Sequence, residues 1–142
     1  VLTIRGNASQ RWNEKLLEIG RMTLLRMQND KRNTLVAKPT LITHDAKEAM
    51  NGCDMVFLCV PAFAHEVYLS AISPHVETGT RIVGMPAYPG FLWLVRDAFG
   101  AELAAKVKAI GTDTLPWACR FTEYGCNVQI SGTKQEISIC GG

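Results

Sequence analysis

An uninterrupted apolar run at residues 55–60, MVFLCV, constrains the fold of this chain more than any other feature. It shows no alternation of polar and apolar residues, so both of its faces are expected to be covered, as in a parallel strand of an α/β protein. Pro61 follows directly and ends the hydrogen-bonded ladder, because proline has no backbone N–H to donate. The run therefore predicts a buried parallel strand that delivers a loop to one edge of a sheet.

Strand and helix signals alternate along the rest of the chain. Further strands are expected at 1–4, 41–43, 80–85 and 106–111, and helices at 9–20, from 45 onward, at 62–73 and at 91–99. Two hairpins are expected, one joining 22–28 to 34–39 and one joining 119–124 to 127–132. In the first helix, Ser9 is the candidate N-cap, and Trp12, Leu16 and Leu17 are expected to share one face. The alternation predicts an α/β fold with a doubly wound, mostly parallel sheet and helices on both of its faces.

Composition excludes several classes of protein. With 142 residues the chain is long enough for one domain with a real core, and its net charge of +2 is too small to favour nucleic acid or a membrane as a partner. The five cysteines have no paired spacing suited to zinc, so no metal site is expected, and Cys59 is expected to be a small buried hydrophobe. An odd cysteine count, without a signal peptide or a long apolar segment, favours the cytoplasm.

The pair His65-Glu66 raises the question of metal chemistry. The helical zinc-protease pattern needs a second histidine four residues after the first, and position 69 is Leu, so that interpretation fails. Both residues are instead expected at the start of the helix that follows Pro61, with His65 packing or capping and Glu66 near the positive helix end. His44 and His75 have no convergent partners in the sequence and are expected at the surface.

Proline-containing loops follow three of the expected strands, at 60–63, 85–90 and 112–117. The carboxyl ends of parallel strands meet at one edge of a sheet, and ligands of open α/β sheets bind outside that edge. One such loop would mean only that proline ends strands. Three loops at one edge favour a ligand site there.

The same loops resemble the opine dehydrogenase family. The matching motifs are VPAFAHE at 60–66, GMPAYPGF at 84–91 and TLPWACRFTEYGCNVQISGTK at 114–134, in an order that spans the chain and includes Arg11-Trp12. The resemblance implies an NADH-binding Rossmann domain followed by a helical substrate domain. It also implies a role in pyruvate metabolism and anaerobic glycolysis, through reductive condensation of an amino acid with a 2-oxo acid, usually pyruvate. The partners would be these two small molecules, which form an imine that hydride from the nicotinamide reduces to a secondary amine.

The resemblance also implies that residues 1–142 are a partial dinucleotide-binding domain. The chain begins where the second strand of the family's domain is expected, so the first strand and the Gly-rich turn that holds the pyrophosphate would be missing. The family's proton-handling histidine would lie in the helical domain, outside this chain. We therefore expect no catalytic residue here and expect the fragment alone to be inactive.

Cofactor-binding residues follow from the same alignment of motifs. At the adenosine end, Asn7 is expected to bond the ribose hydroxyls, while Arg5 could instead favour a 2′-phosphate; the family favours NAD over NADP. The loop expected along the cofactor comprises Val60, Pro61, Ala62 and Phe63, whose short Pro-Ala exit lets the backbone approach a flat ligand. The resemblance further places Pro86, Thr114 and Cys119 at the cofactor, the last two near the nicotinamide end.

Tyr88 is the main departure from the octopine-type pattern, which carries an amide side chain at this position. An aromatic ring would change the size and polarity of the substrate corner and shift the preference away from arginine, although position 88 could equally be a turn residue facing solvent. Cys119 is not expected to act as a nucleophile, because hydride transfer needs positioning rather than a covalent intermediate. Arg120 could bind a carboxylate bidentately or be a surface charge of the hairpin.

Two alternatives remain from the sequence. One is a related two-domain dehydrogenase that uses NAD or NADP and acts on a 2-oxo acid or on glycerol 3-phosphate. The other is a nucleotide-binding module without chemistry. The motif TLPWACR argues against the first.

Overall fold

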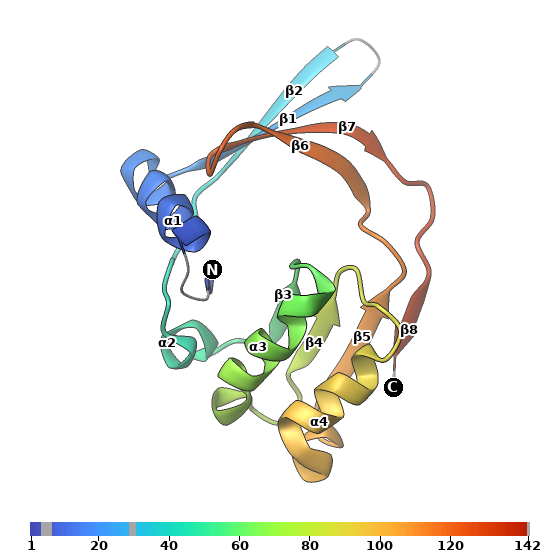
Figure 1. Ribbon diagram of the computed structural model, residues 1–142. Coiled ribbons are helices and arrows are strands. Elements are labelled where there is room, and N and C mark those ends of the chain that lie inside the picture. Colours follow the sequence, from blue (N-terminus) through green and yellow to red (C-terminus); the bar gives the residue numbers. More distant parts are fainter. Residues whose placement is uncertain (4–6, 29–30, 142) are drawn as a thin grey trace. The chain divides into compact units, whose positions relative to one another are not determined.

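The computed structural model describes residues 1–3, 7–28 and 31–141, with the backbone alone for residues 7–9, 27–28 and 31–32. The chain divides into two compact units, Val1–His44 with Pro116–Gln135, and Asp45–Leu115 with Glu136–Gly142 (Figure 1). Each unit contains its own four-stranded sheet. The single sheet expected from the sequence is therefore replaced by two mixed sheets.

The sheet of the first unit is built from the two expected hairpins. β1 (Met22–Gln28) pairs antiparallel with β2 (Lys31–Ala37), and β6 (Trp117–Glu123) pairs antiparallel with β7 (Asn127–Thr133). β1 also pairs in parallel with β7, which gives the strand order β2-β1-β7-β6. Both hairpin predictions are confirmed, and the parallel pair between them joins segments about a hundred residues apart.

The helix of the first unit, α1, spans Asn7–Ile19. It ends at Gly20, whose N–H donates to the carbonyl of Leu16 over 2.7 Å and whose φ of 69° suits glycine. Leu16 is fully buried, but Leu17 is 65% exposed, so the predicted common face is wrong for Leu17. Ser9 is the third residue of α1, so its assignment as the N-cap is also wrong.

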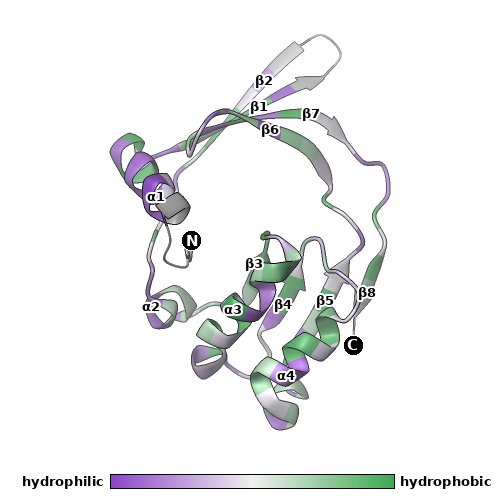
Figure 2. Cartoon of the chain, in the orientation of Figure 1, coloured by the Kyte–Doolittle hydropathy of each residue, from purple (hydrophilic) through white to green (hydrophobic). Residues whose placement is uncertain are grey.

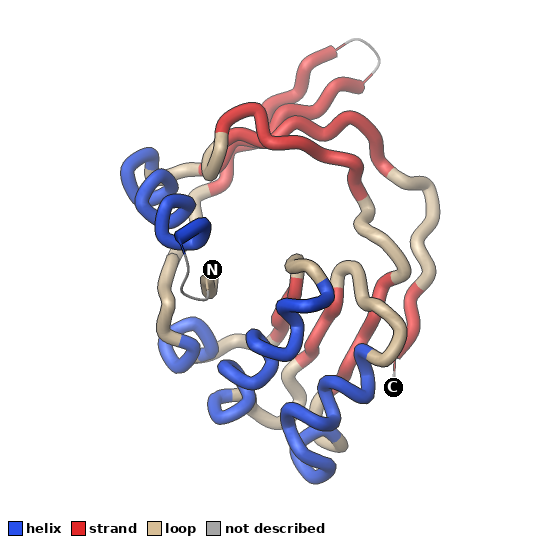
Figure 3. The backbone as a smooth tube through the Cα atoms, viewed as in Figure 1, coloured by secondary structure: helices blue, strands red, loops and turns tan. Residues whose placement is uncertain are grey.

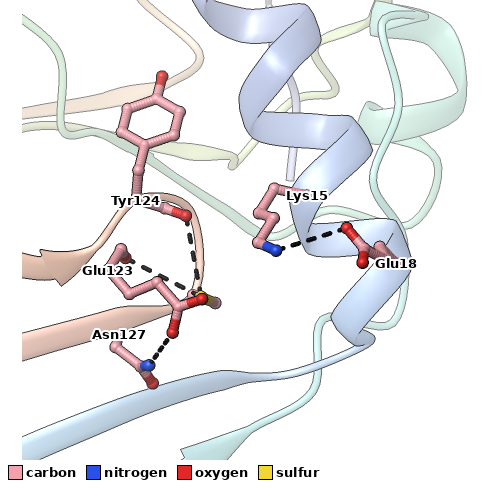
Figure 4. A network of polar contacts seen from close by, with 6 residues as sticks. Lys15, Glu18, Glu123, Tyr124 and Asn127 are labelled. Carbon is pink, nitrogen blue, oxygen red and sulfur yellow. Dashed lines mark hydrogen bonds and ion pairs between the residues drawn. The ribbon is translucent and has the colours of Figure 1, made fainter.

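α1 packs against the turn between β6 and β7. A Cβ at Gly125, which has φ of 81°, would lie 3.3 Å from the Cβ of Lys15, so helix and turn are in close contact. Figure 4 shows the polar groups around this contact: Lys15 pairs with Glu18 over 3.5 Å, and Asn127 donates to Glu123 over 2.6 Å. Both interactions are exposed and contribute little to stability.

The expected strands at 1–4 and 41–43 are reduced to one parallel bridge between Leu2 and Thr43. The N–H of Thr3 donates to the carbonyl of Thr43 over 3.0 Å, and Ile4 lies outside the described residues. The side chain of Asn13 donates to Thr3 Oγ1 over 2.7 Å, and His44 Nδ1 lies 2.6 Å from the Thr3 carbonyl oxygen. His44 is exposed, as expected, but it helps to hold this bridge.

The sheet of the second unit is the parallel one. β3 (Met55–Leu58), β4 (Arg81–Gly84) and β5 (Lys108–Thr112) run parallel, and β8 (Ile139–Gly141) closes the order β3-β4-β5-β8 antiparallel to β5. The described strands are shorter than the apolar runs that predict them: β3 ends at Leu58, and β4 ends at Gly84. The parallel strands themselves are confirmed.

Helices connect these strands. α2 (Ala46–Met50) is capped by Asp45, which accepts from the N–H of Lys47 over 2.8 Å, as expected. α3 (Ala62–Ile72) continues into the 3-10 turn η1 (Ser73–His75) and leads from β3 to β4, while α4 (Phe91–Ala104) leads from β4 to β5. Two successive right-handed crossovers in the same direction along a sheet place both helices on the same face. Figure 3 shows α3 and α4 side by side, and the two helices contact each other.

The core of the second unit lies between this helix pair and the sheet. Its fully buried members include Leu69 and Ile72 of α3 and Ile82 of β4. Met55 is 38% exposed and Phe57 is 54% exposed, so the expectation that residues 55–60 are covered on both faces is wrong for these two side chains. Figure 2 shows hydrophobic residues in β8 and at the beginning of α4. Both segments border the candidate site described below.

The described residues also test the expectations about cysteines and membranes. All five cysteines are free thiols. Cys59 is exposed, which corrects the expectation that it is buried, because the strand already ends at Leu58. In the part of the chain that the structure describes, every helix is too short or too polar to cross a bilayer.

Candidate functional site at the carboxyl ends of the parallel strands

Three loops meet at the carboxyl edge of β3, β4 and β5, and we call residues 60–63, 85–90 and 113–115 the strand-end loops. They bring together most of the residues predicted to contact the cofactor or substrate: Val60, Pro61, Ala62, Phe63, Pro86, Tyr88 and Thr114. The parallel register explains the meeting, because Leu58 lies opposite Gly84 and Gly84 lies opposite Gly111. The strands therefore end level with one another.

The loop at 85–90 is fastened to both neighbours of its own strand. The N–H of Met85 donates to the carbonyl of Leu58 in β3 over 3.1 Å, and the N–H of Ala87 donates to the carbonyl of Thr112 in β5 over 2.8 Å. The loop thus lies across the sheet edge instead of extending freely into solvent. Its backbone position is fixed on two sides before Tyr88 is reached.

Two glycines create the space that the loop occupies. A Cβ at Gly111 would lie 2.7 Å from the Cβ of Ala87, and a Cβ at Gly84 would lie 2.9 Å from that same atom. A Cβ at Gly84 would also lie 2.9 Å from the ring of Phe91. Any side chain at either position would force the loop away from the sheet. The sequence carries a glycine near the end of each of these two strands, but its local pattern does not show that both glycines face the same alanine.

The end of β5 is held by its own polar groups. The hydroxyl of Thr112, which is 3% exposed, donates to the carbonyl of Thr114 over 2.9 Å. Asp113 forms two bonds with Ser138 just before β8: its N–H donates to the Ser138 carbonyl, and its carboxylate accepts from the Ser138 N–H, each over 3.1 Å. The antiparallel strand β8 is thereby tied to the third strand-end loop.

The first strand-end loop leads directly into α3. Pro61 occupies the N-cap position, and its carbonyl accepts from the N–H of Ala64 over 2.9 Å. Phe63 is 85% exposed, so its ring is not part of the core and is free to cover a ligand. Glu66 is the fifth residue of α3, beyond its first turn, so the expectation that it serves the positive helix end is wrong.

His65 is the buried polar residue of this region, with only 2% of its surface exposed. Its ring makes an edge-on contact with Phe91, with centroids 5.3 Å apart and planes at 72°. Burial lowers the pKa of the imidazole, and a hydrogen bond to the backbone of Val60 opposes this shift without reversing it. Nε2 has no hydrogen-bond partner among the described residues, and an unpaired buried polar atom costs about 1–3 kcal/mol.

A cavity of about 640 Å³ lies beside the second loop, between the beginning of α4 and β8. Its walls are mainly apolar and include the exposed residues Trp93 and Ile139, with Asp113 as a charged member of the lining. Tyr88, which is 56% exposed, is the single predicted site residue that lines it. The other predicted residues of the strand-end loops, Val60, Pro61, Ala62, Phe63, Pro86 and Thr114, are not among its lining residues.

Three predicted residues are not brought into this group. Arg5 lies outside the described residues, and Asn7 begins α1 in the first unit, where its side chain is not described. Cys119 is half-buried in β6, also in the first unit. Their assignment to the cofactor remains a prediction from the sequence.

The parallel strands, their helical crossovers and the loops at one carboxyl edge define a Rossmann-type α/β protein. No family model matches the chain. Curated relatives do: octopine dehydrogenase of Pecten maximus is 40% identical over 97% of this chain, and tauropine dehydrogenase of Arabella iricolor is 37% identical over 94% of it. The chain covers 34% of each of these relatives, so it spans about a third of their length.

Solved structures of opine dehydrogenases are also similar to this chain. Octopine dehydrogenase with NADH and L-arginine superposes with a TM-score of 0.91 at 38% identity, covering 98% of this chain and 34% of that one. Yersinopine dehydrogenase has a TM-score of 0.82 over 99% of this chain, but its 13% identity supports the shared fold alone. The chain is similar to the opine dehydrogenases over nearly its whole length, which confirms both the resemblance and the predicted fold class.

Proposed function

We propose that the protein containing this chain is an NADH-dependent opine dehydrogenase. The observation that carries the proposal is the 40% identity to octopine dehydrogenase across 97% of the chain, which includes all three strand-end loops. The substrates would be an amino acid and pyruvate or a similar 2-oxo acid. These condense to an imine with loss of water, and hydride and a proton convert the imine to a secondary amine.

Within this proposal the described residues bind and orient, whereas a second domain handles protons. Bound NADH would supply hydride to the imine carbon. Val60, Pro61, Ala62 and the exposed ring of Phe63 would lie along the cofactor, with Pro86 and Thr114 on the neighbouring strand ends. A helical substrate domain outside this chain would carry the proton-transfer residue. The free thiols of all five cysteines support a reducing location such as the cytoplasm.

The first prediction concerns the requirement for two substrates. The full-length protein should oxidise NADH only when a 2-oxo acid and an amino acid are both present, because the imine is the hydride acceptor. The measurement is the loss of NADH absorbance with pyruvate and a panel of glycine, alanine, taurine and arginine, with each substrate omitted in turn and with NADPH compared with NADH.

The outcomes separate this proposal from its alternatives. Turnover with pyruvate alone would indicate a 2-oxo-acid reductase, a class whose fold also resembles this chain: a ketopantoate reductase from Ralstonia eutropha JMP134 has a TM-score of 0.60 at 17% identity. Tight NADH binding without turnover under any condition would indicate a nucleotide-binding module instead.

The second prediction concerns the amine. Tyr88 lines the mainly apolar cavity, whereas the octopine-type pattern carries an amide at this position. Replacing Tyr88→Gln should raise kcat/KM for arginine relative to alanine by about tenfold, because an amide offers a carbonyl oxygen and two N–H donors to a polar side chain where tyrosine offers a single hydroxyl. The control is Tyr124→Gln, the same change on a half-exposed tyrosine at the β6–β7 turn. An unchanged arginine-to-alanine ratio would show that Tyr88 does not shape the amine site.

A further inference from the structure

His65 interacts with Val60 of the first strand-end loop and contacts Phe91, which follows the second loop directly. It is the fourth residue of α3, two residues after Phe63 ends the first loop, and it is hydrogen-bonded to the backbone of Val60. Its ring packs edge-on against Phe91, the first residue after the loop at 85–90. A side chain that is 2% exposed and touches both segments is placed to fix the distance between them.

The imidazole nitrogen of His65 that bonds to Val60 can be identified, because the other nitrogen is buried without a partner. Nε2 is buried and lacks a partner among the described residues, so the bond to Val60 is made by Nδ1. A bond that favours the charged form of the imidazole is one in which the ring donates, and the backbone group that accepts is the Val60 carbonyl. Burial lowers the pKa of the imidazole, which favours the neutral ring, and the bond to the Val60 carbonyl requires its hydrogen on Nδ1.

Phe91 connects His65 to the loop on the substrate side. Its ring, 5% exposed, lies where a side chain at Gly84 would otherwise be, and its N–H donates to the carbonyl of Tyr88 over 3.1 Å. A shift of Phe91 would therefore move the end of the loop that carries Tyr88. Val60 belongs to the loop predicted to lie along the cofactor, so a shift of Val60 would move that loop in the same way.

We propose that His65 is a positioning residue that holds the cofactor loop through its Nδ1 bond to Val60 and the amine-side loop through its ring contact with Phe91. This inference rests on the function proposed above. It assigns His65 two separable tasks, one for each loop. A residue that only stabilised the fold would affect both loops alike.

Two substitutions separate the tasks in the full-length protein. His65→Asn keeps an amide donor near the position of Nδ1 but removes the ring, so the KM for the amine should rise about tenfold while the KM for NADH stays within about threefold. His65→Phe keeps a ring against Phe91 but removes the donor, so the KM for NADH should rise about tenfold with little change for the amine. Ser70→Ala, an exposed change on the same helix, is the matched control and should leave both values unchanged.

A third variant guards against a failure to fold. Phe91→Leu removes the ring partner and leaves the bond to Val60, so it should reproduce the kinetic pattern of His65→Asn. A higher KM for the amine in His65→Asn and Phe91→Leu, together with a higher KM for NADH in His65→Phe, would support the proposal. Equal changes in both KM values, no change in either, a change in thermal stability alone, or disagreement between Phe91→Leu and His65→Asn would overturn it.

The dissociation constant of NADH, measured by fluorescence titration, keeps this test separate from that of the proposed function. Absence of amine-dependent turnover in the unmodified protein would refute the proposed function. The weaker NADH binding expected for His65→Phe, against unchanged binding for His65→Asn, would still be readable in that case. Equal NADH affinities in the two variants would refute the role of the Val60 bond.

Discussion

Replacing Gly111→Ala should lower both the stability of the full-length protein and its kcat/KM. The new Cβ would lie 2.7 Å from the Cβ of Ala87, a separation that carbon atoms do not tolerate, and its other near neighbour is the Cys140 carbonyl oxygen at 3.8 Å. The strand must bend or the loop at 85–90 must lift, at a cost of about 1–3 kcal/mol. Since the lifted loop carries Pro86 and Tyr88, kcat/KM should fall by about tenfold to a hundredfold.

A second substitution tests whether the clash is the cause. Ala87→Gly removes the atom that the new Cβ would meet, so the double variant Gly111→Ala with Ala87→Gly should recover most of the lost stability and activity. Gly132→Ala is the matched control, because a Cβ at this β7 glycine meets no atom within 4 Å. Thermal unfolding and steady-state kinetics on the four variants decide the matter. Purely additive losses in the double variant would show that the loop is not seated on Gly111.

Replacing Leu69→Ala should produce the largest loss of stability among the substitutions considered. Leu69 is fully buried on α3, with Ile72 and Ile82 as further fully buried members of the same core. Truncating a buried leucine removes its transfer free energy and leaves a cavity, which together cost about 2–5 kcal/mol. The loss should also weaken NADH binding, because α3 begins at the loop that we propose lies along the cofactor.

The control for this substitution is Leu17→Ala on α1. The side chain of Leu17 is 65% exposed, so its removal should change the unfolding free energy by about 0.5 kcal/mol or less. Urea unfolding of the full-length variants, followed by a probe in each compact unit, measures both changes. Similar losses at the two positions would contradict the assignment of the core of the second unit.

Glycine accounts for the main difference between the predicted and the observed site. The sequence motifs place GMPAYPGF at a strand end, and the structure confirms a loop there. They do not show that Gly84 and Gly111 lie opposite each other in the parallel register, because that pairing joins residues 27 positions apart. The close seating of Ala87 on both glycines is a property of the assembled sheet.

His65 illustrates the same limit from the side of a single residue. Its position after Pro61 predicts the beginning of a helix, and its residue type leaves packing, capping and catalysis open. Burial and the contact with Phe91, 26 positions along the chain, exclude an exposed proton-transfer role and suggest positioning instead. Neither property can be derived from periodicity, because the spacing of a helix determines its face but not its neighbours.

The sequence by itself determined the local elements and the family resemblance: both hairpins, the parallel strands of the second unit, the helix capped by Asp45 and the three strand-end loops. These depend on backbone preferences and on burial patterns within a few residues of one another. Tertiary structure alone decided that the hairpins form a separate sheet through the parallel pairing of β1 with β7, and that Met55 and Phe57 stay exposed. Strand pairing and the burial of side chains involve segments that are distant in the chain. Their free energy depends on which surfaces come into contact, and a local sequence pattern does not contain that information.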